Sequence, residues 1–313
     1  MGALKQKKRP LVSIITPSYN QGCFIEQTIK SVLSQNYKNI EYIVIDGGST
    51  DTTLDILNKY NGQFTWISEP DRGQADAINK GLKMAKGELL AWLNSDDTYL
   101  PGAIKKVVRF MQKHPEYKMV YGEGYYISKN SKIINRYPTE PFDYWRLSQT
   151  CYICQPTVFF TRDVFENIGY LDVNLKACLD YDYWIRIGSQ FKVAKIDEYL
   201  AAFRIHSNNK TITLKKLIYR EIFSIVKKYY GVVSIAWTYG YSDFLIYGSN
   251  YKYKRPWPDW IVSILAILLF IYHNYYNPKF LFNDVKYLLK NMVKLKRYNY
   301  SIKDITVWIN ENQ

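Results

Sequence analysis

The chain has 313 residues, of which 47% are hydrophobic and 22% charged, and its formal net charge is +14. These values exclude a wholly disordered chain and leave room for one large domain with an appendage. The positive charge favours anionic partners, which are nucleic acid, an anionic lipid surface or phosphorylated substrates.

The cysteines and the first residues indicate a cytoplasmic protein. The only CxxC pair, Cys151 and Cys154, has no second pair that would complete a zinc site. We therefore expect reduced thiols. Residues 1–10 are basic, and the apolar run that follows is too short for the core of a signal peptide and predicts a strand.

The first hundred residues alternate between strand and helix patterns. Apolar runs predict four strands, at residues 11–16, 40–46, 64–69 and 88–94. Apolar residues at helical spacing and capping signals predict three helices, at residues 23–35, 51–60 and 73–87. This alternation predicts an α/β fold with a mostly parallel sheet covered by helices. Ligands of such sheets bind beyond the carboxyl ends of the strands.

Small, acidic or glycine-rich residues follow each of these strands. Asp46 precedes two glycines that let a ligand approach the backbone, so its carboxylate can bind a base or a ribose. The alternative is a glycine-rich turn with a helix-capping acid. Asp71 and Arg72 precede a helix N-terminus, where Arg72 can reach a diphosphate. The alternative there is a surface ion pair.

The fourth strand ends in AWLNSDD, residues 91–97. The adjacent carboxylates of Asp96 and Asp97 repel each other unless a cation neutralises them. Hard divalent metals do so while they bridge phosphate oxygens. We therefore predict a metal at this position, and the alternative is that the two acids cap the next helix.

The pattern between residues 101 and 206 is mixed, and it contains two further pairs of polar residues. Asp180 and Asp182 are two apart in a predicted helix and so point to different faces. One can serve as a general base, whereas Asp182 can instead form an ion pair with Arg186. Arg204 and His206 alternate along a predicted strand and both suit a diphosphate–metal site, although a structural histidine is the alternative.

The residues beyond 211 predict basic amphipathic helices, the first of them at 214–231, and Lys286, Lys290 and Lys294 form one basic stripe. The apolar run 260–272 would be a helix of about 20 Å, shorter than the roughly 30 Å core of a bilayer. We therefore expect no full span. Basic helices with Trp and Tyr favour peripheral binding to an anionic membrane surface, and the alternative is an ordinary helical cap.

Four segments together resemble glycosyltransferase family 2. They are VSIITPSYNQGCFIEQTIKSVLSQNYKNIEYIVIDGGSTDTT, SEPDRGQADAINKGLKMAKGE, LAWLNSDD and LDYDYWIRI. The resemblance covers residues 10–207 in the right order and spacing. It implies an inverting, metal-dependent enzyme of the GT-A fold that uses a nucleotide sugar. We expect a basic segment at 1–10, a catalytic domain at 11–210 and a helical appendage at 211–313.

The resemblance also implies a role for each candidate residue. The nucleotide and donor site would contain Thr16, Pro17, Tyr19, Asp46, Asp71, Arg72, Asn94, Asp96, Asp97 and Arg204. Asp180 would be the catalytic base, with Gln155 and Asp182 at the sugar and acceptor site. Asp96 and His206 would bind Mg²⁺ or Mn²⁺. The sequence departs from the family pattern at Asn94, where an aspartate is usual, and at Leu179, where an acid usually precedes the base.

We therefore expect transfer from a UDP-sugar to a glycan or a polyprenyl-diphosphate-linked acceptor in cell-surface glycan assembly. The enzyme would lie peripherally on the inner face of the cell membrane. A second hypothesis, based on Asn94 and Leu179, is a catalytically weak sugar-nucleotide-binding partner of an assembly complex. Nucleic-acid binding is disfavoured because the acidic strand ends would repel phosphates.

Overall fold

The computed structural model describes residues 9–248 and 259–275. The chain divides into two compact units, which are described separately. The first contains residues 1–142 and 153–204, and the second contains residues 143–152 and 205–313. Residues 143–152 thus join the second unit, although the sequence places them within the expected catalytic domain.

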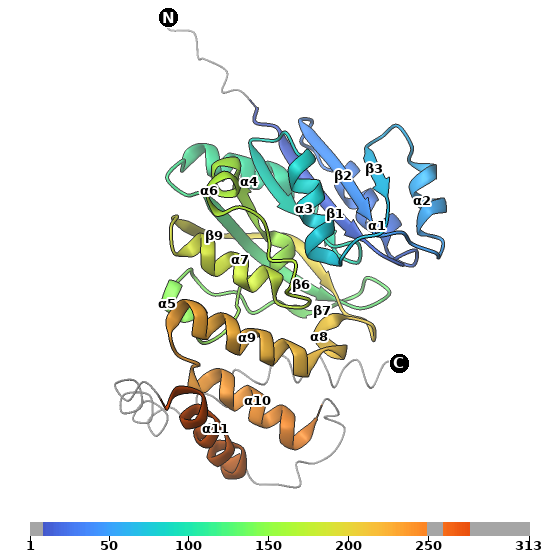
Figure 1. The fold of residues 1–313 in the computed structure, drawn as a ribbon. Coiled ribbons are helices and arrows are strands. Elements are labelled where there is room, and N and C mark those ends of the chain that lie inside the picture. The colour runs from blue at the N-terminus through green and yellow to red at the C-terminus, as the bar shows by residue number, and fades with distance from the viewer. Residues whose placement is uncertain (1–8, 249–258, 276–313) are drawn as a thin grey trace, which may run out of the picture. The chain divides into compact units, whose positions relative to one another are not determined.

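Nine strands of the described residues form one mixed sheet in the first unit (Figure 1). Its strand order is β3-β2-β1-β4-β8-β6-β9-β5, with β7 paired to β6. The strands are β1 (Val12–Ser18), β2 (Ile40–Asp46), β3 (Thr65–Ser68), β4 (Leu89–Trp92), β5 (Thr98–Tyr99), β6 (Met119–Ile127), β7 (Ile133–Arg136), β8 (Phe159–Thr161) and β9 (Val193–Arg204). Strands β1 to β4 pair in parallel, which confirms the predicted parallel core.

Helices cover both faces of this sheet. They are α1 (Ile25–Leu33), α2 (Thr53–Lys59), α3 (Gln74–Met84), α4 (Ala103–Lys113), α6 (Arg162–Ile168) and α7 (Leu179–Gly188), with a short 3₁₀ turn at Gln155–Thr157. The three predicted helices between the first four strands are therefore confirmed.

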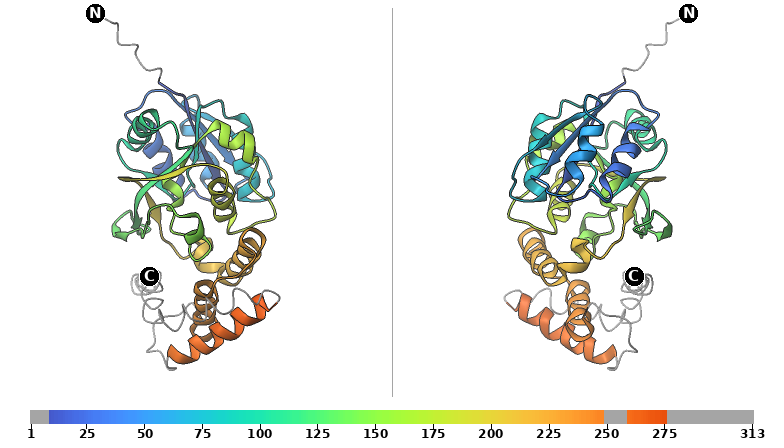
Figure 2. Two further views of the ribbon diagram at one scale, coloured as in Figure 1. Left: turned by 90° about the vertical axis from the view of Figure 1, so that its left-hand side faces the viewer. Right: turned by 90° about the vertical axis from the view of Figure 1, so that its right-hand side faces the viewer.

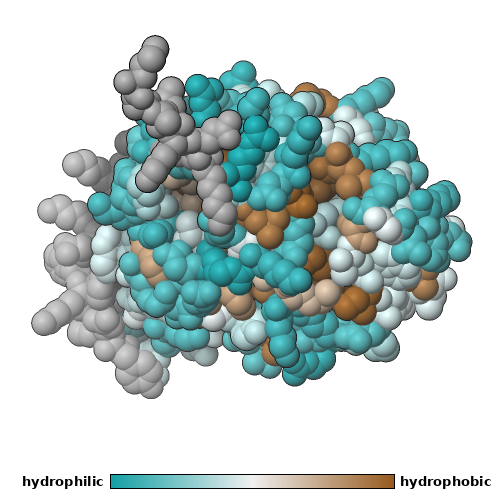
Figure 3. Space-filling model, turned by 90° about the horizontal axis from the view of Figure 1, so that it is seen from above, coloured by the Kyte–Doolittle hydropathy of each residue, from teal (hydrophilic) through white to brown (hydrophobic). Residues whose placement is uncertain are grey.

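The surface seen from above is largely hydrophilic, with hydrophobic residues in patches between polar ones (Figure 3).

Alternation along β1 explains how both faces of the sheet are packed. Ile14 joins the cluster formed with α1 and α4, whereas Ile15 points to the opposite face. There α3 approaches closely through Gly81, where an added Cβ would lie 2.4 Å from Ile15 Cγ2. This close approach fixes the position of α3, whose N-terminus faces the carboxyl ends of the parallel strands.

One sequence prediction about strand length is wrong. Arg204 and His206 were expected on one face of a single strand, but β9 ends at Arg204. The backbone N–H of His206 donates to Asn209 Oδ1 at 2.5 Å, and Asn209 N–H donates to the carbonyl of His206 at 3.0 Å. This turn follows the end of the strand, and His206 belongs to the second unit.

The second unit is helical in its described part. Its helices are α5 (Tyr144–Leu147), α8 (Lys210–Thr213), α9 (Lys215–Tyr230), α10 (Ile235–Tyr247) and α11 (Asp259–Asn274). Over the described ranges, no helix combines the length and apolar character needed to cross a membrane. The predicted basic stripe of Lys286, Lys290 and Lys294 lies outside the described residues.

Candidate active site

The carboxyl ends of the parallel strands are aligned by the sheet register. Ser18 of β1 lies opposite Asp46 of β2, and Asp46 lies opposite Ser68 of β3. Beyond β4, Leu93 N–H still bonds to the carbonyl of Ile15. The loops that follow these four strands therefore begin along one edge of the sheet, as the sequence predicted.

Asp46 is fully buried and holds the loop that follows β2. Its carboxylate accepts hydrogen bonds from the backbone N–H groups of Gly48 (3.1 Å) and Ser49 (2.8 Å). It also accepts from the hydroxyls of Ser49 (2.5 Å) and Ser68 (2.7 Å). These bonds occupy most of its acceptor positions. The structure thus gives Asp46 a loop-shaping role, and its contact with a base or ribose stays a prediction.

The loops after β2 and β3 meet at Gly47. A Cβ on Gly47 would lie 2.6 Å from Asp71 Oδ2, so only a glycine leaves room for this carboxylate. Asp71 in turn accepts a 2.7 Å bond from the N–H of Gly73, at the start of α3. The structure therefore brings Asp46 and Asp71 into adjoining loops.

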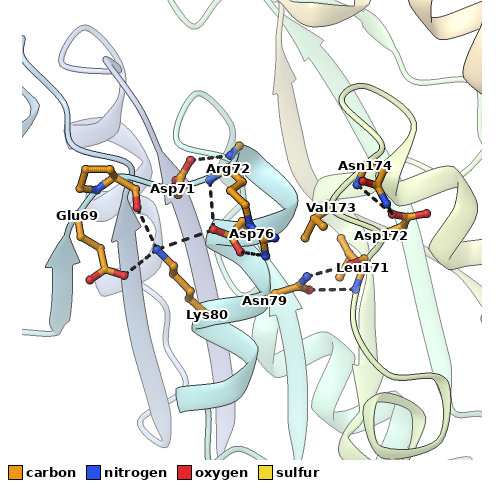
Figure 4. Close-up of polar contacts among 12 residues, drawn as sticks. Glu69, Asp71, Arg72, Asp76, Asn79, Lys80, Leu171, Asp172, Val173 and Asn174 are labelled. Carbon is orange, nitrogen blue, oxygen red and sulfur yellow. Dashed lines mark hydrogen bonds and ion pairs between the residues drawn. The ribbon is translucent and has the colours of Figure 1, made fainter.

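Arg72 forms the surface ion pair that the sequence left as an alternative. Its guanidinium lies 3.2 Å from Asp76 one turn into α3, and both are drawn in Figure 4. The side chain of Arg72 is 72% exposed, so this pair contributes little to stability. Lys176 Nζ donates to the carbonyl of Arg72 at 3.0 Å. The guanidinium can therefore leave Asp76 for an anionic ligand at small cost.

The segment before α7 is fastened beside α3. Asn79 of α3 donates to the carbonyl of Leu171 and accepts from the N–H of Leu171, both at 2.9 Å (Figure 4). An amide that pairs with both backbone groups of one residue fixes that residue in place. The loop that leads to Asp180 is thus tied to the helix that begins at Gln74.

Three side-chain amides form a chain at the end of β4, which we call the amide relay: Gln74, Asn94 and Gln155. Gln74 Nε2 donates to Asn94 Oδ1 at 2.7 Å, and Asn94 Nδ2 donates to Gln155 Oε1 at 3.0 Å. Gln155 Nε2 donates to the carbonyl of Trp92 at 3.0 Å. A carbonyl can only accept, so this last bond fixes the orientation of all three amides.

Position 94 must therefore both donate and accept. Asn94 Nδ2 also lies 3.4 Å from Asp97 Oδ2. A carboxylate at this position would face the acceptors of Gln155 and Asp97 without a proton to offer. The departure from the family's usual aspartate is thus explained by the residues around Asn94.

The substitution Asn94→Asp is expected to destabilise the fold by about 2 kcal/mol at neutral pH, because it removes two donated bonds and adds a charge beside Asp96 and Asp97. The penalty should shrink as the pH falls toward about 4, where the new carboxyl becomes protonated. Thermal unfolding at several pH values measures this. An equal loss of stability at every pH would contradict the explanation.

Residues 94–97, which we call the acidic loop, are held in place by hydrogen bonds from α1 and β9. The Thr28 hydroxyl lies 2.9 Å from the carbonyl of Ser95 and 2.7 Å from that of Asp97. The Asp97 carboxylate is buried and accepts a 2.8 Å bond from the N–H of Arg204. Burial, and after it the charge of Asp96, raises the pKa of Asp97 well above its ordinary value.

The raised pKa of Asp97 implies that its charge weakens the fold at neutral pH. The contribution of Asp97 to stability should fall as the pH rises from about 4 through its folded-state pKa, because this carboxyl ionises more easily in the unfolded chain. Asp97→Asn should raise stability by about 1 kcal/mol at neutral pH and by nothing near pH 4. Thermal melts at both pH values test this, and a gain confined to low pH would refute it.

Arg204 lies beneath the acidic loop and is 0% exposed. Its Nε donates to the carbonyl of Asp96 at 2.7 Å, and its Nη2 donates to Gln27 Oε1 at 2.8 Å. Its Nη1 donates to the carbonyls of Ser128 and Lys129. The guanidinium is thus engaged with protein groups on each nitrogen. It positions the acidic loop, and its contact with a diphosphate stays a prediction.

Helix α7 is anchored to β4 by aromatic packing. Trp184 stacks on Trp92 with ring centroids 4.9 Å apart and an interplanar angle of 14°. Asp180 is partly exposed in the first turn of α7, whereas Asp182 is buried and forms a 2.9 Å ion pair with Arg186. The two aspartates therefore face different surroundings, as their spacing predicted, and Asp182 makes the ion pair that was its alternative.

The remaining predicted site residues differ in their exposure to solvent. Thr16 is buried, and its hydroxyl accepts a 3.1 Å bond from Tyr42. Pro17 is also buried, but Tyr19 is 60% exposed beyond the end of β1. Of these three, Tyr19 is the one that presents its side chain at the surface. His206 belongs to the second unit, and its metal role stays a prediction.

Sequence reasoning missed the residues that support the site from a distance. Gln74 and Thr28 lie 20 and 67 residues from their partners in the acidic loop. No local spacing indicates such pairs. Ser18 could not be singled out either, although its buried hydroxyl has no hydrogen-bond partner among the described residues.

Residues 13–169, half of the chain, match the family model "Glycosyl transferase family 2". A UDP-Glc:alpha-D-GlcNAc-diphosphoundecaprenol beta-1,3-glucosyltransferase, WfaP of Escherichia coli, is 33% identical over 219 residues, which are 67% of this chain and 84% of that protein. An uncharacterised glycosyltransferase of Rickettsia prowazekii is 33% identical over 217 residues, 65% of this chain and 67% of its own. The chain belongs to glycosyl transferase family 2.

Solved structures show the same fold. TarS 1–349 of S. aureus, in complex with UDP-GlcNAc, matches with a TM-score of 0.57 at 19% identity, over 84% of this chain and 81% of that one. The mannosyltransferase PcManGT of Pyrobaculum calidifontis, with GDP-Man and Mn²⁺, matches with a TM-score of 0.52 at 16% identity, over 97% and 84%. The expected GT-A fold is thereby confirmed. As a member of glycosyl transferase family 2, the protein is a glycosyltransferase.

Proposed function

We propose that the protein transfers a sugar from a nucleotide diphosphate sugar, with UDP as the nucleotide, to a hydroxyl of a lipid-linked or glycan acceptor, with inversion. The observation that carries this proposal is the grouping of Asp71, the acidic loop and the segment that leads into α7 around the carboxyl edge of the sheet. WfaP is named for a UDP-glucose donor and a diphosphoundecaprenol-linked acceptor, which supports the same classes here.

The donor would be bound along this edge. Tyr19 and Asp71 would hold the nucleoside, with Thr16, Pro17 and Asp46 forming the floor beneath them. Arg72 would leave its exposed pair with Asp76 to bind the diphosphate. Because the loops at Gly47 and Gly73 are fixed by hydrogen bonds, they would be in place before the donor arrives.

A divalent cation would bind at the acidic loop. Asp96 is partly exposed, whereas the carboxylate of Asp97 is turned inward to Arg204 and Asn94. Mg²⁺ is usually held by one or two carboxylates together with substrate phosphates, and Asp96 offers such an oxygen ligand. The described part of the chain has no group of three His, Cys, Asp or Glu side chains placed to hold a metal. Bound Mg²⁺ or Mn²⁺ would stabilise charge on the departing diphosphate.

Asp180 would act as the base. Its carboxylate would take the proton of the acceptor hydroxyl, and the acceptor oxygen would form a bond to the anomeric carbon. The bond between that carbon and the diphosphate oxygen would break, and the nucleoside diphosphate would leave with the electron pair. Gln155, held by the amide relay, and the ion pair of Asp182 would orient the acceptor side.

A donor screen tests this proposal most directly. The purified protein is heated with individual nucleotide sugars in the presence of Mn²⁺, because a bound donor raises the apparent melting temperature. The nucleotide sugar that stabilises is then incubated alone, and release of the nucleoside diphosphate is followed with and without EDTA. Binding without any release would favour the sugar-nucleotide-binding partner instead of an enzyme. The absence of any stabilising donor would refute the proposal.

A further inference from the structure

The inner face of α11 packs within the second unit. Val262, Ala266 and Phe270 are fully buried, and α11 lies against α10, as both views of Figure 2 show. The side chain of Asn274 bonds to the N–H and the carbonyl of Val233, both at 2.9 Å. The orientation of α11 about its own axis is therefore fixed within this unit.

That orientation exposes a row of large apolar residues, which we call the outer face of α11. It consists of Trp260 (58% exposed), Ile264 (49%), Leu268 (57%) and Tyr272 (70%). Residues four apart in a helix lie above one another, so this is one continuous row. Ile271 beside it is also exposed. Soluble proteins rarely leave such a row in water, and it marks an interaction surface.

The composition of the row indicates a lipid interface. Trp260 lies in the first turn and Tyr272 in the last, with Ile264 and Leu268 between them. Trp and Tyr are the residues that favour the boundary between water and hydrocarbon. A helix of 16 residues is about 24 Å long, less than the roughly 30 Å of a bilayer core, so it would lie along the surface.

Positive charge accompanies this row. The rings of Phe223 and His273 are 4.7 Å apart, which places α9 beside the last turn of α11. Lys227, one turn beyond Phe223, is exposed there. Sequence on both sides of α11 is also basic, with Lys252, Lys254 and Arg255 before it and Lys279, Lys286, Lys290 and Lys294 after it. This charge complements an anionic surface and opposes pairing with a second, equally basic copy.

We propose that the outer face of α11 docks the protein on an anionic lipid surface. Ile264 and Leu268 enter the acyl boundary, Trp260 and Tyr272 lie at the headgroup level, and Lys227 binds the anionic headgroups. The net positive charge of the chain strengthens the attraction to an anionic surface. The proposal does not depend on the donor or on the catalytic base. Its failure is therefore distinguishable from failure of the proposed glycosyl transfer.

The experiment is co-sedimentation of the full chain with vesicles. One set contains phosphatidylcholine alone, and the other contains about one third phosphatidylglycerol. The wild-type protein should bind the anionic vesicles, bind the neutral ones much more weakly, and lose affinity as salt screens the charges. The double variant Ile264→Asp/Leu268→Asp should lower the partition coefficient at least about tenfold.

Ile133→Asp is the control for an added surface aspartate, because Ile133 is an exposed apolar residue of β7 in the first unit, and this variant should bind vesicles like the wild type. Circular dichroism and release of nucleoside diphosphate from the donor should be unchanged in the double variant. If the aspartates disturb folding, Ile264→Ser/Leu268→Ser replaces them.

Two results would overturn the proposal. One is vesicle binding that the folded double variant retains. The other is a wild-type protein that does not bind vesicles. Sedimentation velocity would then show whether it is a monomer or a dimer, and whether the double variant still forms that dimer. A dimer that the double variant no longer forms would assign the outer face of α11 to a second copy of this chain instead of to lipid.

Discussion

Asp180→Asn is expected to reduce sugar transfer by a factor of about 10³ or more while the affinity for the nucleotide stays within twofold. The asparagine has the same shape but cannot accept the proton of the acceptor hydroxyl. The hydrogen bond that the Tyr181 N–H donates to Asp180 Oδ1 can persist in the variant, so the first turn of α7 should keep its structure. Transfer is measured with the acceptor at saturation, and nucleotide affinity by calorimetry.

Asp182→Asn provides the contrast, because it lies two residues away in the same helix. It breaks a buried ion pair with Arg186 and should cost about 3 kcal/mol of stability. The melting temperature therefore separates the two variants: Asp180→Asn melts like the wild type and Asp182→Asn melts lower. Normal turnover by a folded Asp180→Asn protein would assign the base to another residue.

Asp96→Ala should reduce transfer by a factor of about 10² to 10³, because the charge of the departing diphosphate is then poorly stabilised. The backbone carbonyl of residue 96 remains, so its bond from Arg204 Nε should keep the acidic loop in place. The loss should therefore appear in turnover and in the concentration of Mn²⁺ needed for half-maximal rate. Both are measured from the release of nucleoside diphosphate.

Asp55→Ala is the control for this substitution, since Asp55 is an exposed aspartate of α2. It should leave both the rate and the Mn²⁺ requirement unchanged. An Asp96→Ala protein with a wild-type Mn²⁺ requirement would show that the cation, if used, is bound elsewhere. A second outcome, equal loss in Asp96→Ala and Asp55→Ala, would indicate a general effect of net charge.

The first four strands and the helices between them were predictable because their patterns are local. Strands β1, β2 and β4 are buried on both faces, so they read as continuous apolar runs that stop where the chain reaches the carboxyl edge. Strand β9 was recognised only at its end. Its exposed residues Asp197 and Glu198 interrupt the apolar pattern, and the sequence alone does not place it beside β6.

The sequence predicted where the site lies on the sheet, but it did not predict the hydrogen bonds that hold the site together. The order of motifs placed Asp46, Asp71 and Asp96 near one edge of the sheet, because parallel strands bring their ends together. The sequence did not reveal that Arg204 supports the acidic loop. Its bonding partners lie 73 to 177 residues away, and only the folded chain brings them together.

The direction of the amide relay limits how position 94 can change. Each of its amides donates toward the carbonyl of Trp92, so the chain of bonds has a beginning at Gln74 and an end at β4. If residue 94 became an aspartate, Gln155 could turn its amide toward it, but the Trp92 carbonyl would then lose its donor. Turning Gln155 would therefore only transfer the lack of a hydrogen-bond donor from Gln155 Oε1 to the Trp92 carbonyl. A change at position 94 thus requires a coordinated change at position 155.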